Sequence, residues 1–184
     1  MKLNDIEQLI KTKYLNMFKL KLTNKVGNNK DYFIVSRRNK EDLSCINKEK
    51  EFCDGVMILP ITREGEVVLV KQFRPAANEF IYELPAGIID EGEDIITAAK
   101  RELFEETGLR CLEHQILLKP SYSAVGISDE KTAVVKMLVE GEISAQNLED
   151  DEEIEVIKIK VSEAKQFAQS KNMSIKAGLL LLSL

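Results

Sequence analysis

Residues 87–109, from Gly87 to Leu109, have the sequence GIIDEGEDIITAAKRELFEETGL. Its second half predicts an amphipathic helix over residues 94–107, with apolar positions at Ile95, Ala98, Ala99, Leu103 and Phe104. Gly108 follows, and glycine commonly ends a helix in the left-handed conformation. Gly87 and Gly92 precede the helix and permit a close backbone approach. The stretch therefore predicts a tight loop that leads into a helix.

Three glutamates of this predicted helix, Glu102, Glu105 and Glu106, are separated by three and four residues and project from one face. Three crowded carboxylates repel one another, and the neighbouring Arg101 cannot neutralise all of them. Divalent cations would supply the missing charge, and oxygen ligands without sulfur or imidazole suit Mg²⁺ or Mn²⁺. A solvated acidic face is the alternative for three glutamates taken alone. An EF-hand is disfavoured because its alternating Asp/Asn pattern is missing.

The same stretch resembles the Nudix box at every defining position. Five residues separate Gly87 from Glu93, and seven more separate Glu93 from the run RELFEETGL at 101–109. The resemblance implies an α/β Nudix fold, in which an α/β/α sandwich surrounds a mixed curved sheet and the box helix lies against that sheet. This topology comes from the resemblance, since the sequence pattern itself indicates only the types of element.

Outside the box, apolar runs and alternating patterns predict mainly strands. Residues 3–14 form a short amphipathic segment, and residues 18–36 a β-hairpin. Further strands are expected at 55–61, 67–70, 81–84, 115–118, 132–139 and 154–161, and helices at 162–169 and 174–182. We expect residues 1–50 to form an N-terminal hairpin extension that does not fold alone, and residues 51–184 to form the Nudix hydrolase domain.

The composition disfavours several classes of protein. The 184 residues carry 31 acidic and 26 basic side chains, an excess that argues against nucleic acid or an anionic membrane as the main partner. Residues 87–109 hold seven acidic and two basic side chains, and this net excess of acidic side chains equals that of the whole chain. No apolar run approaches the roughly 20 residues that span a bilayer. Three cysteines without metal-ligand spacing, and no signal peptide, indicate a cytoplasmic protein with free thiols.

Upstream of the box, the runs VKQFR at 70–74 and ELPAG at 83–87 resemble the ADP-ribose pyrophosphatase branch of Nudix enzymes. The resemblance implies that Arg74 contacts substrate phosphate and that the carbonyl of Ala86 binds metal. On a strand, Gln72 and Arg74 point to the same side, so a joint site is geometrically possible. A surface cation is the alternative interpretation of Arg74.

Three more side chains are candidates for contact with substrate. Glu83 either pairs with Arg101 or accepts a hydrogen bond from the substrate. Arg37 and Arg38 follow the predicted hairpin and could reach an adenine or a phosphate. A solvated surface pair is the competing interpretation of the two arginines.

Downstream, residues 120–130 have the sequence PSYSAVGISDE and resemble a loop of the same branch, in which Ser-Pro-Gly precedes an acidic residue that positions the attacking water. Glu130 is the candidate general base, Asp129 a lesser one, and Glu105 the next if the loop is only a turn with solvated acids. Val125 stands where the branch has proline, which leaves the exact substrate open.

Carried onto this chain, the resemblance implies a Mg²⁺- or Mn²⁺-dependent enzyme that hydrolyses the diphosphate bond of a nucleoside diphosphate linked to another moiety. ADP-ribose, split into AMP and ribose 5-phosphate, is the leading substrate. The implied metal ligands are the carbonyl of Ala86 and the carboxylates of Glu93, Glu102, Glu105 and Glu106. The implied catalytic residues are Glu105, Glu130 and Arg101, and the implied substrate contacts are Arg74, Glu83 and Arg37.

Other functions stay open at this point. The substrate could be another nucleotide sugar, a dinucleoside polyphosphate, a coenzyme or an oxidised nucleotide, although Arg74 and the run at 83–86 argue against the last. A non-catalytic Nudix sensor is a further alternative, which the intact set of Arg101 and three glutamates disfavours. The branch often packs an N-terminal segment on a second subunit, so we expect a homodimer with Phe18, Tyr32 or Phe33 near the interface. The same apolar hairpin could equally cover its own core.

Overall fold

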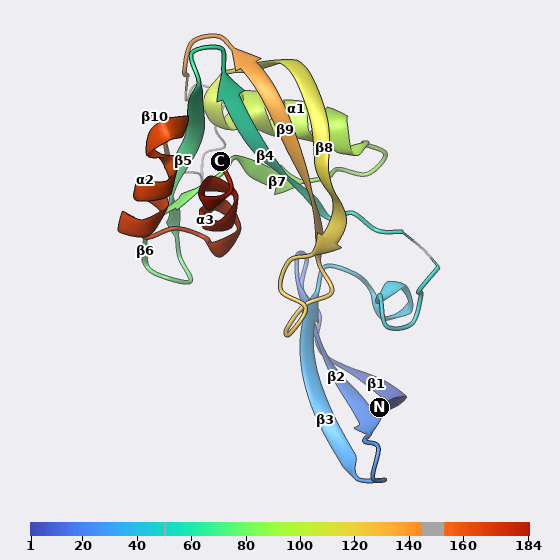
Figure 1. Cartoon of the computed structure of the whole chain (residues 1–184). Helices are drawn as coiled ribbons and strands as arrows, with labels where there is room; N and C mark the ends of the chain where they lie inside the picture. The colour runs from blue at the N-terminus through green and yellow to red at the C-terminus, as the bar shows by residue number, and fades with distance from the viewer. Residues whose placement is uncertain (50, 145–152) are drawn as a thin grey trace. The chain divides into compact units, whose positions relative to one another are not determined.

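The computed structural model describes residues 1–49, 51–144 and 153–184 (Figure 1). The chain divides into two compact units. The first unit comprises Met1–Asp54 and Pro120–Thr132, and the second unit comprises Gly55–Lys119 and Ala133–Leu184. Residue 50, where the predicted extension ends, lies outside the described residues, so that boundary stays a prediction.

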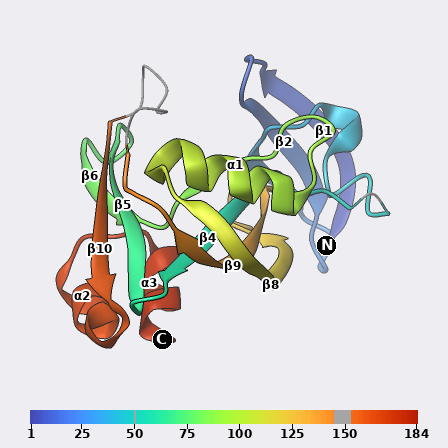
Figure 2. The ribbon, with the colours of Figure 1, turned by 90° about the horizontal axis from the view of Figure 1, so that it is seen from above.

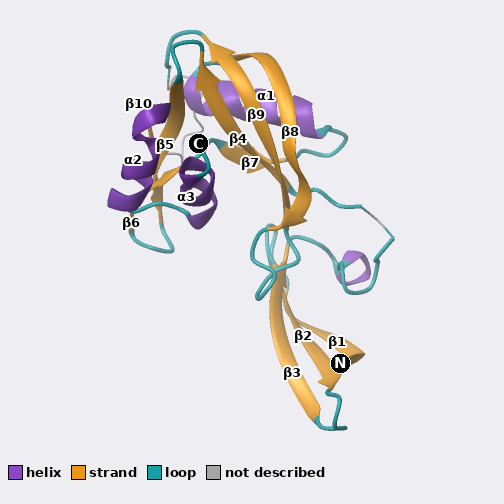
Figure 3. Cartoon of the chain, viewed as in Figure 1, coloured by secondary structure: helices purple, strands orange, loops and turns teal. Residues whose placement is uncertain are grey.

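The second unit is built on a seven-stranded sheet (Figure 3). Its strands are β4 (Gly55–Thr62), β5 (Glu66–Arg74), β6 (Glu79–Glu83), β7 (Ala86–Ile88), β8 (Arg110–Tyr122), β9 (Lys131–Glu140) and β10 (Ile154–Lys160). The order is β10-β5-β4-β9-β8, with β6 beside β5 and β7 beside β4. The helices are α1 (Ile95–Thr107), α2 (Ala164–Ser170) and α3 (Ile175–Leu182), and a 3₁₀ turn, η2, covers Val161–Glu163. No helix of the described residues is long and apolar enough to cross a membrane.

Helices cover both faces of this sheet, α1 on one face and α2 with α3 on the other (Figures 1 and 2). Val56 and Ile58 of β4 are buried in the cluster that contains α1. Met57 and Leu59, which alternate with them, are buried in the cluster that contains α2 and α3. Because successive side chains of a strand point to opposite faces, an apolar run such as that of β4 suits a sheet covered on both sides. The predicted α/β/α sandwich is confirmed.

Residues that favour the start and the end of a helix flank α1. The Asp94 side chain accepts hydrogen bonds from the backbone N–H groups of Ile96 and Thr97 at 2.8 and 3.0 Å. It thereby satisfies N–H groups that the first helical turn leaves without partners. Gly108 ends the helix with a φ of 74°, in the left-handed region that favours glycine. The loop before the helix starts as the short strand β7, which pairs antiparallel with β4 and was not predicted.

The first unit contains the three-stranded sheet β1 (Lys2–Ile10), β2 (Asn16–Thr23) and β3 (Asn29–Ser36), and the 3₁₀ turn η1 (Lys40–Asp42). The predicted hairpin corresponds to β2 and β3, and the predicted amphipathic segment is the third strand, β1. Phe18 is fully buried in this unit's own core, together with Leu43. Phe33 is half exposed. Of these two expected interface residues, only Phe33 is therefore accessible in the described structure.

Candidate active site

Two glutamates of α1 are directed at the short strand β7. The carboxylate of Glu102 fills the space beside Gly87, since a Cβ placed on Gly87 would lie 1.9 Å from Glu102 Cδ. The backbone N–H of Ala86 donates to Glu106 Oε2 at 3.2 Å, and Glu106 is only 3 % exposed. The absence of a side chain at Gly87 thus leaves room for the carboxylate of Glu102. One helix face and one strand bring the carboxylates of Glu102 and Glu106 to the backbone of residues 86–87.

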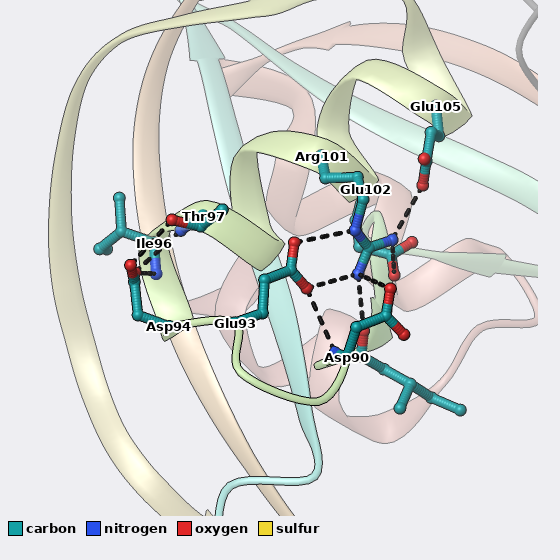
Figure 4. A network of polar contacts seen from close by, with 9 residues as sticks. Asp90, Glu93, Asp94, Ile96, Thr97, Arg101, Glu102 and Glu105 are labelled. Carbon is teal, nitrogen blue, oxygen red and sulfur yellow. Dashed lines mark hydrogen bonds and ion pairs between the residues drawn. The ribbon is translucent and has the colours of Figure 1, made fainter.

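Arg101 joins the helix to the loop that precedes it (Figure 4). Its Nη1 donates to Glu102 Oε1 at 2.8 Å and to Glu105 Oε2 at 2.9 Å. Its Nε and Nη2 donate to the two carboxylate oxygens of Glu93 at 3.0 and 2.9 Å. Nη2 also donates to the carbonyl of Ile88 at 2.9 Å, a contact that the sequence did not indicate. One guanidinium therefore holds three of the box carboxylates in place.

These contacts favour the charged forms of Glu93 and Arg101. The hydrogen bond from Arg101 lowers the pKa of Glu93, and a backbone N–H, that of Asp90, adds to this effect. In return, the carboxylate of Glu93 is the main cause that raises the pKa of Arg101. The side chain of Glu105 is 40 % exposed, the largest exposure among the carboxylates that Arg101 holds within the helix. Glu105 is thus the member of this set most open to solvent.

The residues present fit a hard divalent cation in their chemistry. The predicted donors are glutamate carboxylates and the backbone carbonyl of Ala86, which are oxygen ligands of the kind that Mg²⁺ and Mn²⁺ take. Within the described parts of the chain, no three acidic, histidine or cysteine side chains converge closely enough to form a complete metal site. Arg101 instead contacts three of the glutamates. The structure thus brings the predicted ligands together without assembling them around one point.

Arg74 and Glu83 form a second polar feature of the same unit. Arg74 Nε donates to Glu83 Oε2 at 2.5 Å. Glu83 lies opposite Val70 in the β5–β6 pairing, and every second residue from Val68 to Arg74 shares one face of β5. Val68 is buried on the face that α1 covers, so Arg74 and Glu83 belong to the face of the box helix. Glu83 therefore pairs with Arg74 and not with Arg101, which was one of the two interactions predicted for it.

Two other predicted residues, Arg37 and Glu130, meet within the first unit. Arg37 Nε lies 3.3 Å from Glu130 Oε2, and about a third of each side chain is exposed. The backbone of Glu130 is held as well, because its N–H donates to Ser128 Oγ and its carbonyl accepts from the N–H of Ser123. Arg37, predicted to contact substrate, therefore contacts the candidate base.

The interpretation of Arg37 and Arg38 as a surface pair is wrong for Arg38. Its side chain is 6 % exposed and forms ion pairs with Asp54 at 2.5 Å and Asp129 at 3.1 Å. Both arginines lie in a bend that follows β3, and there Arg37 stays partly exposed while Arg38 is buried. Asp129, the lesser candidate base, is also buried, and it accepts from the N–H of Ser44 at 2.9 Å. It is therefore unsuited to meet a substrate.

Known proteins resemble this chain in both sequence and fold. A methanol dehydrogenase activator of Bacillus methanolicus is 36 % identical over 121 residues, which cover 65 % of this chain and 64 % of the relative. An ADP-ribose pyrophosphatase of Bacillus subtilis (strain 168) is 32 % identical over 123 residues, with the same coverage. An ADP-ribose pyrophosphatase of Saccharomyces cerevisiae is 36 % identical over 117 residues, 59 % of this chain and 51 % of the relative. The chain thus spans between half and two-thirds of the length of these relatives.

The fold and the family are supported by two further matches. The crystal structure of an ADP compounds hydrolase superposes with a TM-score of 0.76 and 17 % sequence identity, and the match covers 99 % of this chain and 91 % of the other. At that identity the match shows the fold alone. The NUDIX domain model matches residues 51–178, a range that contains both the box and the strands before it. The chain therefore belongs to the NUDIX domain family, as the box at 87–109 predicted.

Proposed function

We propose that this protein hydrolyses the diphosphate bond of a nucleoside diphosphate linked to a second moiety, with ADP-ribose as the first candidate substrate. The observation that carries the proposal is the position of the Glu102 carboxylate beside Gly87, together with the hydrogen bond from the N–H of Ala86 to the carboxylate of Glu106. Two relatives bear the name ADP-ribose pyrophosphatase. The expected products are AMP and ribose 5-phosphate.

The proposed metal ligands are those of the box and the strand before it: Ala86 through its carbonyl, and Glu93, Glu102, Glu105 and Glu106 through their carboxylates. Mg²⁺ or Mn²⁺ bound there would neutralise the charge of the diphosphate oxygens. Arg101 orients the carboxylates of Glu102 and Glu105 by direct hydrogen bonds. Glu93 braces the loop through the same guanidinium and serves as an outer ligand.

The proposed substrate contacts are Arg74, Glu83 and Arg37. Arg74 binds a phosphate oxygen through its remaining guanidinium nitrogens, since only its Nε donates to Glu83. Glu83 thereby fixes the direction of Arg74. Arg37 is partly exposed beside Glu130 and remains available to a substrate oxygen.

Glu130 is the proposed general base, which accepts the proton of the attacking water. Its carboxylate is partly exposed, whereas that of Asp129 is buried. Glu105 is the second candidate because it is the more exposed of the glutamates that Arg101 holds on the helix. Val125 is largely exposed. It stands where the ADP-ribose pyrophosphatase branch has proline, and this departure leaves the choice among linked nucleoside diphosphates open.

The experiment that tests the function is product analysis with Mg²⁺ present and with Mg²⁺ chelated. The panel contains ADP-ribose, another nucleotide sugar, a dinucleoside polyphosphate and 8-oxo-dGTP. AMP and ribose 5-phosphate in equal amounts, formed only with the metal, would support the proposal. Tight binding of ADP-ribose without turnover would indicate a sensor, and preferred turnover of 8-oxo-dGTP an enzyme that removes oxidised nucleotides.

A variant of the site makes the same experiment sharper. Glu106→Gln keeps the size of the side chain and removes its charge, so turnover should fall by about 1,000-fold, the scale of a lost electrostatic contact at a reacting centre. Glu91→Gln in the loop before α1 is the matched control, since Glu91 is exposed and has no proposed role. Near-normal turnover of Glu106→Gln would remove Glu106 from the metal site.

The assembly and the cellular compartment remain proposals. A homodimer would use the accessible part of the N-terminal sheet, where Phe33 is half exposed. Sedimentation at several concentrations tests this, and a Phe33→Ser variant should shift the equilibrium towards the monomer. A cytoplasmic location agrees with the free cysteines Cys45, Cys53 and Cys111, and fractionation of cells tests it.

A further inference from the structure

A buried arginine of the first unit, Arg38, forms ion pairs with two acidic residues. Arg38 Nη2 donates to Asp54 Oδ2 at 2.5 Å. Its Nη1 donates to the backbone carbonyl of Asp129 at 3.1 Å and lies 3.1 Å from Oδ1 of the same residue. The guanidinium carbon lies 4.3 Å from the centre of the Phe52 ring. Both terminal nitrogens of the guanidinium are thus used on residues that are distant in sequence.

The two acidic partners hold the backbone on both sides of Glu130. Asp129, which precedes it, is bound to Arg38 through both its carbonyl and its side chain. Lys131, which follows it, donates its N–H to Asp54 Oδ2 at 2.7 Å, and its carbonyl accepts from the N–H of Asp54 at 2.8 Å. Because Asp54 Oδ2 also accepts from Arg38, one guanidinium organises both neighbours of Glu130.

Glu130 itself has little freedom left in its backbone. Its N–H donates to Ser128 Oγ at 3.1 Å, and its carbonyl accepts from the N–H of Ser123 at 2.9 Å. Its carboxylate nevertheless remains partly exposed beside Arg37. A general base must be positioned within reach of the proton that it accepts, and the backbone contacts limit the positions that this partly exposed carboxylate can take.

We propose that Arg38 is a positioning residue, which fixes residues 129–131 through Asp54 and Asp129 and so directs the carboxylate of Glu130 for proton transfer. The proposal rests on the proposed role of Glu130 as general base. Lysine cannot replace arginine here, because a single ammonium group does not form the planar, two-sided contact that the guanidinium makes. Removal of either contact would leave the segment less firmly held while Glu130 itself stays unchanged.

The test is a double-mutant cycle on the turnover of ADP-ribose with excess Mg²⁺. Glu130→Gln should lower kcat by about 100-fold or more. Arg38→Lys should lower kcat by about 10- to 100-fold with a smaller change in KM. If Arg38 acts through Glu130, the double variant is no slower than Glu130→Gln alone. A residue that only supports the fold would add its full loss in the double variant.

A second variant and a control keep the outcome decisive. Asp54→Asn preserves the volume of the side chain and one acceptor oxygen but weakens the contacts of Asp54 with Arg38 and Lys131. Its loss of kcat should likewise not add to that of Glu130→Gln. Lys19→Met removes the 2.6 Å ion pair between Lys19 and Glu7 elsewhere in the first unit, and it should leave kcat unchanged. Circular dichroism and thermal melting show that each variant is folded.

Each remaining outcome overturns a specific statement. Normal kcat in folded Arg38→Lys and Asp54→Asn, or additive losses with Glu130→Gln, would overturn the positioning role while leaving the proposed hydrolysis intact. Normal kcat in Glu130→Gln would remove the base assignment and the inference with it. No turnover of ADP-ribose or of the other linked nucleoside diphosphates by the unaltered protein would overturn the proposed function itself.

Discussion

Arg38 of the first unit contacts two carboxylates and Arg101 of the second unit contacts three glutamates, and the two arginines differ in exposure. The side chain of Arg38 is 6 % exposed and that of Arg101 is 28 % exposed. Water and ions reach the charges around Arg101 more than those around Arg38, so its ion pairs contribute less to stability. The pairs of Arg38 are largely removed from water, and loss of one partner would leave buried charge without compensation. The comparison indicates that the same kind of contact contributes more to stability where it is buried, at Arg38, than where it is partly solvated, at Arg101.

The largest expected effect comes from the direct comparison of the two arginines. Arg38→Met should lower the free energy of unfolding by about 3–5 kcal/mol, because Asp54 and Asp129 would remain buried without their cation. Arg101→Met should change it by about 1 kcal/mol or less while it abolishes most turnover. Urea unfolding at neutral pH measures both values, with the exposed Arg63→Met as the control. Equal losses of stability would break the comparison.

Gly87→Ala tests the site without changing any charge. An added Cβ would overlap the carboxylate of Glu102, which can move away because it ends a flexible side chain. We therefore expect turnover to fall by about 100-fold, with a modest loss of stability, since a displaced reacting group is costly. Gly178→Ala in α3 is the matched control, because its Cβ would meet Met173 only at 3.6 Å. Normal turnover in folded Gly87→Ala would show that the position of Glu102 is unimportant.

The features that local sequence controls were predicted, and those that depend on distant partners were not. The helix at 94–107 differs from α1 by one residue at its start, because Asp94 is its cap. The strand β1 was missed because pairing with β2 determines it. The two acidic partners of Arg38 lie 16 and 91 residues away, so no sequence spacing could reveal them.

The Arg74–Glu83 pair extends the comparison to an arginine that is more exposed than Arg38 and Arg101. Nearly half of the Arg74 side chain is exposed, whereas Glu83 is largely covered. Glu83→Gln should raise KM for ADP-ribose by about tenfold with a smaller change in kcat, because the orientation of Arg74 is lost before the chemical step. The control is Glu155→Gln, which breaks an ion pair with Lys71. Lys71 lies on β5, as Arg74 does, and this variant should leave KM unchanged. A fall in kcat alone would place Glu83 at the reacting centre.

The smallest effect is expected from a surface pair in the same unit as Arg38. The hydrogen bond from Lys19 lowers the pKa of Glu7 from its ordinary value of 4.5. A lowered pKa means that the pair stabilises the fold fully above pH 4.5 and that this stabilisation disappears as the pH falls through the folded value. Glu7→Gln should therefore slightly reduce the urea midpoint at pH 6 and have no effect at the lowest pH at which the protein stays folded. High salt should remove the difference at pH 6, because exposed charges are screened. A difference in urea midpoint that persists in high salt would contradict this prediction. It would show that the exposure of an ion pair in this unit does not determine how much the pair stabilises the fold, and the greater stabilisation expected from Arg38 would need another cause.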